Sequence, residues 1–577
     1  MQAQATARTG EHGTRCKGRG SVYLRDMVLS SAGVFVQPVQ PGTGEEGFGY
    51  SDGSGVEDGL LRTIAGASDR TSRSLALKKG IVDWPTKYHL SPSRTNLLRP
   101  FGFLRKSARV LELGCGCGAI TRYLGETCGC VDAVEGSVKR AQITRERCED
   151  LDNVKVYVAN FLNLQFDGRY DVVTLIGVLE YAAMFYPGHA DSKEGAFIAA
   201  LKLAASALKE DGVLVVAIEN QIGLKYWAGC REDHTGTMFD GLHGYPRDDA
   251  AGPGPVTFTR NALTRMINQA GIGFTQYYFP LPDYKLPHSI IADGQAVREG
   301  SMYLHNWAAT RFDEPSGTRA YLFAEPLLVR TICSAGLLGE MANSFLVVAC
   351  KQPLASDDWV AKRYSTERRA CFATETTLCG GEVPRMSKRF LYPGERQDRS
   401  SGFTVRELEE EWQAGDLLLF RFYEAMMDPK TLVPRLVREL RSLNATLLER
   451  KGKGTIDKQG YPLLKPSAFD FGPWNMVVNN GVLVLIDDEW EYDGTLAADY
   501  LMYRSAYNSI FWLDGYLTSK GLVKPGPEGL DSTVFAMVRI VYPDYDHARH
   551  EANRAFDKAT QEYIHGLSDS VVASGAT

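Results

Sequence analysis

The chain has 577 residues, of which 44% are hydrophobic and 23% are charged, and its formal net charge is −6. A chain of this length exceeds what one hydrophobic core usually supports, so we expect about two to four domains. The mildly acidic balance does not predict nucleic-acid binding, and no apolar run approaches the roughly 18 residues of a membrane-spanning helix. The 11 cysteines are odd in number and scattered, which favours reduced thiols in a cytoplasmic protein.

The start of the chain, residues 1–79, is rich in Gly, Ser, Thr and Arg and shows little periodicity. Its first twenty or so residues are basic, but no apolar segment follows them as a secretory signal requires. We therefore predict a loosely ordered N-terminal arm.

A glycine-rich stretch in the second hundred residues carries the first functional signal, at residues 110–118 (VLELGCGCG). A buried strand is predicted to end at residue 113, a turn follows at Gly114, Gly116 and Gly118, and a helix opens after it. This order is typical of the first unit of a nucleotide-binding α/β fold. Glu112 lies just before the turn, where an acid suits a cofactor with a cationic end better than a pyrophosphate.

Polar or small residues also follow the next predicted strands. Glu135 ends the second strand about twenty residues after the turn, where an acid commonly binds a ribose diol. Asn160 and Phe161 follow the third strand, and Gly177 follows the fourth, with Glu180 or Tyr181 beyond it. Because open α/β sheets bind ligands at the carboxyl ends of their strands, we expect these side chains to meet at one edge.

The E-x-G-x-G-x-G pattern and the acid after it resemble the first motifs of class I S-adenosylmethionine (SAM)-dependent methyltransferases. The resemblance implies an α/β, Rossmann-like domain over residues 80–353, with an amide and an apolar residue at the adenine and a small residue beside the methionine. The segment before the glycine turn often folds over the cofactor in this family, although a capped helix with a surface arginine is the alternative here. The implied cofactor-binding residues are Tyr88, Arg94, Glu112, Gly114, Gly116, Gly118, Glu135, Asn160, Phe161, Gly177 and Glu180.

A polar, glycine-punctuated loop after the predicted fifth strand contains His234. This position would line the acceptor pocket, and a histidine can act as a general base near neutral pH. The alternative is a structural or merely exposed histidine. We predict an insertion at residues 282–343 and expect it to carry acceptor specificity.

A different pattern begins at residue 354 and continues to 577. Asp470 is followed five positions later by Asn475, and Asp487 ends an apolar strand beyond a hairpin. This layout resembles aminoglycoside-phosphotransferase-like and protein-kinase-like domains, which are α+β folds. The resemblance implies Asp470 as catalytic base, Asn475 and Asp487 as ligands of Mg²⁺ at bound ATP, and Asp488 as a substitute for Asp487.

The upstream half of this second domain departs from the kinase pattern. Lys388, on the return strand of a predicted hairpin, is the candidate ATP-binding lysine, with Lys362 as the runner-up. Too few residues follow the hairpin for the usual helix, so no partner glutamate can be assigned, and Ala468-Phe469 replaces the usual histidine of the catalytic loop. Both an active kinase and a degenerate domain remain open.

The pairing of the two domains resembles bacterial bifunctional enzymes that phosphorylate and methylate the end of an O-antigen polysaccharide. It implies a sugar, glycan or small-molecule acceptor, and nothing in the chain sets the oligomeric state. One alternative is a natural-product methyltransferase whose second domain only binds substrate or partner. Another is a scaffold that keeps both folds without turnover. Nucleotide binding and SAM binding would separate these readings.

Overall fold

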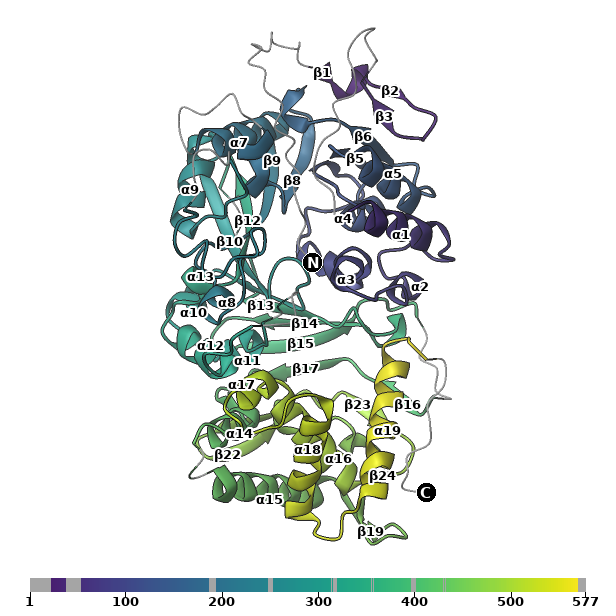
Figure 1. The fold of residues 1–577 in the computed structure, drawn as a ribbon, viewed down its shortest axis with the longest axis vertical. Coiled ribbons are helices and arrows are strands. Elements are labelled where there is room, and N and C mark those ends of the chain that lie inside the picture. Colours follow the sequence, from purple (N-terminus) through teal and green to yellow (C-terminus); the bar gives the residue numbers. More distant parts are fainter. Residues whose placement is uncertain are drawn as a thin grey trace. The chain divides into compact units, whose positions relative to one another are not determined.

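The computed structural model describes residues 22–37, 53–185, 194–246, 253–312, 314, 319–353, 355, 357–395, 401–428, 430 and 432–568. The chain divides into two compact units (Figure 1). Unit 1 comprises residues 1–293, 314–318 and 340–357, and unit 2 comprises 294–313, 319–339 and 358–577. Most of the predicted insertion at 282–343 therefore belongs to unit 2. Within these described ranges, no helix is long and apolar enough to cross a membrane.

Unit 1 contains the predicted Rossmann-like sheet. Five strands pair in parallel in the order β9-β8-β4-β5-β6. Their bounds are Arg109–Leu113 (β4), Cys130–Glu135 (β5), Val154–Val158 (β6), Tyr170–Ile176 (β8) and Leu208–Glu219 (β9). Nearly all their apolar side chains are buried, as expected for a parallel sheet covered on both faces.

Antiparallel strands extend this sheet beyond β9. They are β12 (Ser344–Cys350), β10 (Phe274–Leu281) and β11 (Ser289–Ala292), joined in that order. Helices α4 (Ala119–Thr127) and α5 (Val138–Arg147) contact β5. Helix α7 (Gly195–Ala207) contacts β8, β9 and α9 (Arg260–Gln269), and its alanines allow close packing.

The prediction of a loosely ordered arm over residues 1–79 is wrong wherever the structure describes it. Helices α1 (Ser54–Ala65) and α2 (Leu75–Lys78) form there, and α1 packs against α5 (Figure 1). Leu60 and Ile64 of α1 are fully buried and join one apolar cluster with Ile143 of α5. The overall polar composition concealed these few apolar positions, which recur at helical spacing. Residues 1–21 and 38–52 lie outside the described residues.

The capped helix considered before the glycine turn does not extend over residues 95–104 as a regular helix. A 3-10 helix spans Pro92–Leu97 after α3 (Trp84–Leu90), and no regular helix continues beyond it. Pro100 explains this difference, because proline lacks a backbone donor and disfavours helical conformation in the residue before it.

Unit 2 contains an antiparallel sheet followed by a helical part. The sheet order is β13-β14-β15-β17, and the predicted hairpin is confirmed by the pairing of β14 with β15. The bounds are Ala361–Tyr364 (β13), Thr374–Cys379 (β14), Arg385–Phe390 (β15) and Leu408–Glu411 (β17). Short strands β18 (Asp416–Leu417), β21 (Met476–Asn479) and β22 (Val482–Leu485) pair separately.

The helical part of unit 2 supplies most of its core. Helix α15 (Leu432–Lys451) buries Leu436, Leu440, Leu443 and Leu447, the stripe that the helical spacing predicts. Around it lie α14 (Leu418–Ala425), α16 (Ala498–Phe511), α18 (Pro527–Val541) and α19 (His547–Ile564).

We predict that Leu60→Ala destabilises the protein by about 2–4 kcal/mol, because it leaves a cavity between α1 and α5. Val82→Ala is the control, since Val82 is 83% exposed. Thermal and urea unfolding of both variants measure the difference. Equal stability of the two variants would show that α1 does not contribute to the core.

Candidate functional site

The glycine turn between β4 and α4 adopts a left-handed backbone at all three predicted glycines. The φ angles of Gly114, Gly116 and Gly118 are +80°, +57° and +78°. The N–H of Gly114 donates to the carbonyl of Val134 on β5 at 2.8 Å. A Cβ at Gly114 would lie 2.4 Å from a methyl carbon of Val178, so the turn packs too closely for any side chain. The predicted turn is therefore present, and it leads directly into a helix N-terminus.

Glu135, the last residue of β5, is fixed beside this turn. Its two carboxylate oxygens accept hydrogen bonds from the N–H groups of Gly116 at 2.8 Å and Ser137 at 3.0 Å. A carboxylate oxygen has two lone pairs, so each can still accept a second donor such as a ribose hydroxyl. The geometry thus fits the predicted ribose contact, which stays a prediction.

Glu112 is buried at the end of β4, and its Oε2 has no hydrogen-bond partner among the described residues. Burial raises the pKa of the Glu112 carboxyl to about 8, and interactions with Thr121 and with the charge of Arg94 oppose this shift. A buried carboxylate oxygen without a partner is costly. A cationic amino group bound here would supply a donor to Oε2 and further positive charge.

Arg94 and Tyr88 lie together, as the predicted lid contacts require. Arg94 is only 4% exposed, so the alternative of a surface arginine is wrong. Its guanidinium donates to the Tyr88 hydroxyl at 2.8 Å and to the carbonyls of Tyr284 and Lys285 at 3.1 and 3.0 Å. The guanidinium carbon also lies 4.5 Å from the centroid of the Tyr88 ring, a cation–π contact.

The remaining predicted cofactor residues follow β6 and β8. Asn160 accepts a hydrogen bond from the N–H of Leu162 at 3.1 Å, which caps a short 3-10 helix that begins at Phe161. Gly177 has a φ of +67°, and a Cβ there would lie 2.7 Å from the Tyr284 hydroxyl. Asn160 and Phe161 are half-buried. Their contacts with adenine stay predictions.

Glu180 and His234, predicted for different roles, lie side by side. Glu180 belongs to a 3-10 helix (Leu179–Tyr181) after β8, and its Oε1 is 3.6 Å from His234 Nε2. Glu219, the last residue of β9, places Oε2 3.8 Å from the same nitrogen, and Glu232 places Oε1 3.0 Å from His234 Nδ1. We call Glu180, Glu219, Glu232 and His234 the acidic cluster.

This environment disfavours His234 as a neutral general base. Burial alone would lower the pKa of His234, but the charge of Glu219 and hydrogen bonds to Glu180 and Glu232 raise it well above its usual range. The imidazole therefore carries its proton at neutral pH when these carboxylates are its partners. The exposed alternative is also wrong, because the His234 side chain is 6% exposed.

Sequence reasoning missed three residues of this region, Glu219, Glu232 and Lys285. Lys285 contacts the Glu219 carboxylate, and its Nζ lies 2.8 Å from Asp233 Oδ1. Glu219 offered the same signal as Glu112 and Glu135, an acid at the carboxyl end of a parallel strand. Lys285 offered no spacing signal, because it reaches the site from a distant part of the chain.

The predicted kinase residues of unit 2 come together from separate elements. Lys388 on β15 contacts the Asp487 carboxylate, and its Nζ lies 3.0 Å from Glu489 Oε2. Burial raises the pKa of the Asp470 carboxyl well above its usual range, and the charges of Glu489 and Asp487 add to this effect. Asn475 donates to the Asp470 backbone carbonyl at 3.0 Å. Glu489 had not been singled out in the sequence.

The two runner-up residues have other partners. Lys362 pairs with Glu375 on the neighbouring strand at 2.6 Å. Asp488 pairs with Lys451 of α15 at 2.7 Å. The structure thus favours Lys388 and Asp487 as the interacting pair.

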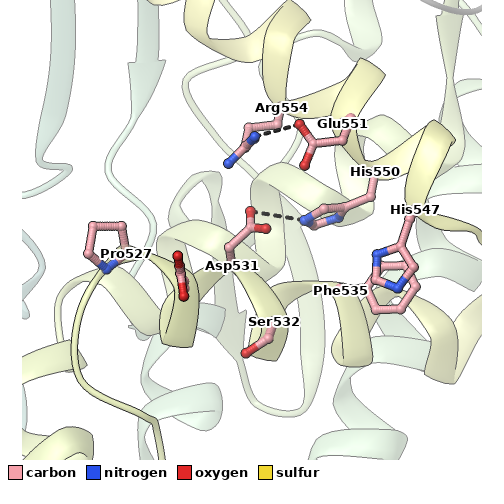
Figure 2. Close-up of a pocket in the computed structure, with 9 residues that line it drawn as sticks. Pro527, Asp531, Ser532, Phe535, His547, His550, Glu551 and Arg554 are labelled. Carbon is pink, nitrogen blue, oxygen red and sulfur yellow. Dashed lines mark hydrogen bonds and ion pairs between the residues drawn. The ribbon is translucent and has the colours of Figure 1, made fainter.

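A pocket of about 330 Å³ lies between α18 and α19 of unit 2 (Figure 2). Asp531 Oδ1 is 3.0 Å from His550 Nε2, and Figure 2 shows these two side chains facing each other. The stacked rings of Phe535 and His547 form one wall. None of the sequence-predicted site residues lines this pocket.

Comparison with known proteins finds a methyltransferase domain in part of unit 1. Residues 110–190 match the family model described as a methyltransferase domain, and no curated protein matches the sequence. A SAM-dependent methyltransferase from Thermotoga maritima is 18% identical, covers 45% of this chain and 93% of its own, and gives a TM-score of 0.24. A TehB-like SAM-dependent methyltransferase from Corynebacterium glutamicum is 12% identical, covers 45% and 88%, and gives 0.25.

These TM-scores are too low for the structural likenesses to carry an argument. The family match spans the glycine turn, Glu135, and the strand that precedes Gly177 and Glu180. It identifies residues 110–190 as part of a methyltransferase domain.

We predict opposite effects of Glu112→Gln on stability and on cofactor affinity. Burial raises the pKa of the Glu112 carboxyl to about 8 in the folded chain, above its ordinary value of 4.5. The free energy of unfolding therefore falls progressively as the pH rises between these two values, because the unfolded chain ionises this group more easily. The variant should gain about 1–3 kcal/mol of stability at pH 8, and less at pH 5. Its SAM affinity should fall, because the carboxylate is lost.

Thermal unfolding at both pH values and calorimetry with SAM measure these effects. Glu210→Gln is the control, because its side chain is 77% exposed. Unchanged stability and unchanged affinity in Glu112→Gln would contradict the assignment of this carboxyl.

Proposed function

We propose that this SAM-dependent methyltransferase binds its cofactor across the carboxyl ends of β4, β5, β6 and β8. The observation that carries the proposal is the unpartnered, buried oxygen of Glu112 at the glycine turn. Glu135 is fixed one strand away by two backbone N–H groups. Together they provide one acid for a cationic amino-acid end and one acid for a ribose diol.

The other predicted cofactor residues complete this site. Arg94 and Tyr88, held by the carbonyls of Tyr284 and Lys285, form its cover. Asn160 and Phe161 would contact adenine, and Gly177 would lie beside the methionine, at a position where a Cβ would clash with the Tyr284 hydroxyl. Bound SAM supplies an electrophilic methyl group. The chain's contribution is to orient that group towards the acceptor and to exclude water.

We propose a hydroxyl-bearing acceptor, namely a sugar, a glycan or a small molecule. The acidic cluster supports this choice, because its buried carboxylates are hydrogen-bond acceptors and hydroxyl groups are donors. The O-antigen polysaccharide end is the specific glycan that the domain pairing suggests. A natural-product acceptor is the alternative and uses the same carboxylates.

Cofactor binding is tested by Glu135→Ala, which removes both acceptors for the ribose hydroxyls. SAM affinity should weaken by about 2–3 kcal/mol, the range for hydrogen bonds to a charged group. Calorimetry measures this loss, and Glu210→Ala is the matched exposed control. Wild-type affinity in Glu135→Ala would refute the ribose contact.

A second function, phosphoryl transfer by unit 2, is favoured by one specific observation. Lys388 and Asp487, far apart in sequence, are in contact near half-buried Asp470. Protein kinases use a lysine for the ATP phosphates, and an aspartate and an asparagine for magnesium. Asn475 and Asp487 would hold Mg²⁺, which neutralises phosphate charge, and Asp470 would orient the acceptor hydroxyl.

Mg-ATP binding to the full chain tests this second function. Wild-type protein should bind Mg-ATP, and Asp487→Asn should weaken binding at least roughly tenfold, because a neutral amide replaces a carboxylate at a hard cation. Asp488→Asn is the matched control, since Asp488 pairs with Lys451 instead. No binding by wild-type protein at millimolar Mg-ATP would leave unit 2 as a binding module.

A further inference from the structure

Three side chains of the acidic cluster converge on a common point in unit 1. The ligand atoms of Glu180, Glu219 and His234 all lie within 4.8 Å of one another. Glu180 lies in the short 3-10 helix after β8, and Glu219 is the last residue of β9. His234 lies in the loop that follows β9. A cation at their centre would therefore be held by parts of the chain that the parallel sheet fixes.

Two of these carboxylates carry oxygens that lack a partner in the described part of the chain. Glu180 is 1% exposed and Glu219 is 0% exposed, and Oε2 of each makes no hydrogen bond there. Glu219 Oε2 points towards His234 at 3.8 Å, while its other oxygen contacts Lys285. Buried carboxylate oxygens are normally paired or bound to a metal, so these two point to a missing ligand.

His234 is oriented as a metal-binding histidine. Its Nδ1 lies 3.0 Å from Glu232 Oε1, and the other Glu232 oxygen accepts the backbone N–H groups of His234 and Thr235, each at 2.7 Å. This contact leaves Nε2 facing Glu180 and Glu219. A carboxylate on the far nitrogen is the usual support of a metal-ligating histidine, because it fixes the ring orientation and the tautomer.

We infer that Glu180, Glu219 and His234 bind one divalent metal ion. Two carboxylates and one imidazole suit Mn²⁺, Fe²⁺ or Zn²⁺ better than Ca²⁺ or Mg²⁺, which favour all-oxygen sites. The ion binds the unpartnered oxygens of Glu180 and Glu219 and compensates negative charge that Lys285 leaves unmatched. Glu232 is a positioning residue, since it acts through His234.

Three protein ligands leave coordination positions open, as catalytic metal sites do. Given the proposed methyl transfer, these positions take an oxygen of the acceptor. An acceptor hydroxyl bound to the ion loses its proton more readily. The proton passes to solvent water, and the acceptor oxygen forms its bond to the methyl carbon as the carbon–sulfur bond of SAM breaks and S-adenosylhomocysteine leaves. The acceptor class therefore becomes one with a metal-binding oxygen.

Mn²⁺ titration of the full chain, freed of metal by a chelator, tests the site. Electron paramagnetic resonance measures free Mn²⁺, and we expect one bound ion per chain. Glu219→Gln and His234→Gln should each weaken binding at least roughly tenfold, and Glu232→Gln by about 10–100-fold. Co²⁺ in place of Mn²⁺ should give visible absorption whose intensity changes in His234→Gln.

The control is Asp531→Asn, which removes the carboxylate of another carboxylate–histidine pair, in unit 2. It should leave Mn²⁺ affinity unchanged. SAM calorimetry and circular dichroism on every variant report whether unit 1 is folded, and Glu219→Asn or His234→Asn replaces the corresponding glutamine variant if that variant does not fold.

Two outcomes overturn the inference. One is wild-type protein that binds SAM but neither Mn²⁺ nor Zn²⁺ at millimolar concentration. The other is Mn²⁺ binding that survives in both Glu219→Gln and His234→Gln. Neither outcome affects the cofactor site, and loss of SAM binding by wild-type protein would instead refute the proposed function. If no metal binds, Glu180, Glu219 and Glu232 hold His234 as a buried imidazolium.

Discussion

The parallel pairing of β4, β5, β8 and β9 is the constraint on which the rest of unit 1 depends. Parallel strands end at the same edge of a sheet, and here Leu113 pairs with Val134 and with Leu175, which in turn pairs with Val216. The acids near those strand ends are thereby brought to one edge. Glu112 and Glu135 serve one half of the edge, and Glu180 and Glu219 the other.

The four carboxylates differ in how the chain satisfies them. Glu135 accepts two backbone N–H groups, so it is fixed before any ligand arrives. Glu112, Glu180 and Glu219 each keep one buried oxygen without a partner in the described residues. Such oxygens lower the free energy of unfolding, and a protein retains them where a bound group supplies the missing partner. On the proposed function, Glu112 and Glu135 form the cofactor half of this edge, and Glu180 and Glu219 form the acceptor half.

Unit 2 presents a comparable concentration of charge around Lys388. A single buried ammonium contacts two carboxylates, Asp487 and Glu489, while Asp470 lies half-buried nearby. A bound nucleotide and its metal would redistribute these partners, because phosphates attract the lysine and the cation attracts the carboxylates. Lys388, Asp487 and Glu489 could thus change partners when a nucleotide binds. The Arg549–Asp499 pair differs, because both oxygens of Asp499 already accept hydrogen bonds from Arg549 and Asn553.

The amino-acid sequence by itself determined the parallel sheet, its glycine turn and the residues Glu112 and Glu135. Local signals sufficed there, because strand periodicity, glycine spacing and the position of an acid after a strand are all read within about ten residues. The same locality explains the α15 stripe and the β14–β15 hairpin. Prediction from local signals failed for α1, because its few apolar positions lie in a polar segment. It also failed for the 3-10 helix that precedes Pro100.

Only the tertiary structure decided what His234 and Arg94 do. The protonation of a histidine depends on the charges that surround it, and Glu180, Glu219 and Glu232 reach His234 from different elements. Arg94 became a buried contact because the carbonyls of Tyr284 and Lys285, from a distant part of the chain, accept its hydrogen bonds. Sequence fixes which groups are available along the chain, whereas electrostatic environment arises from contacts between segments that only the fold brings together.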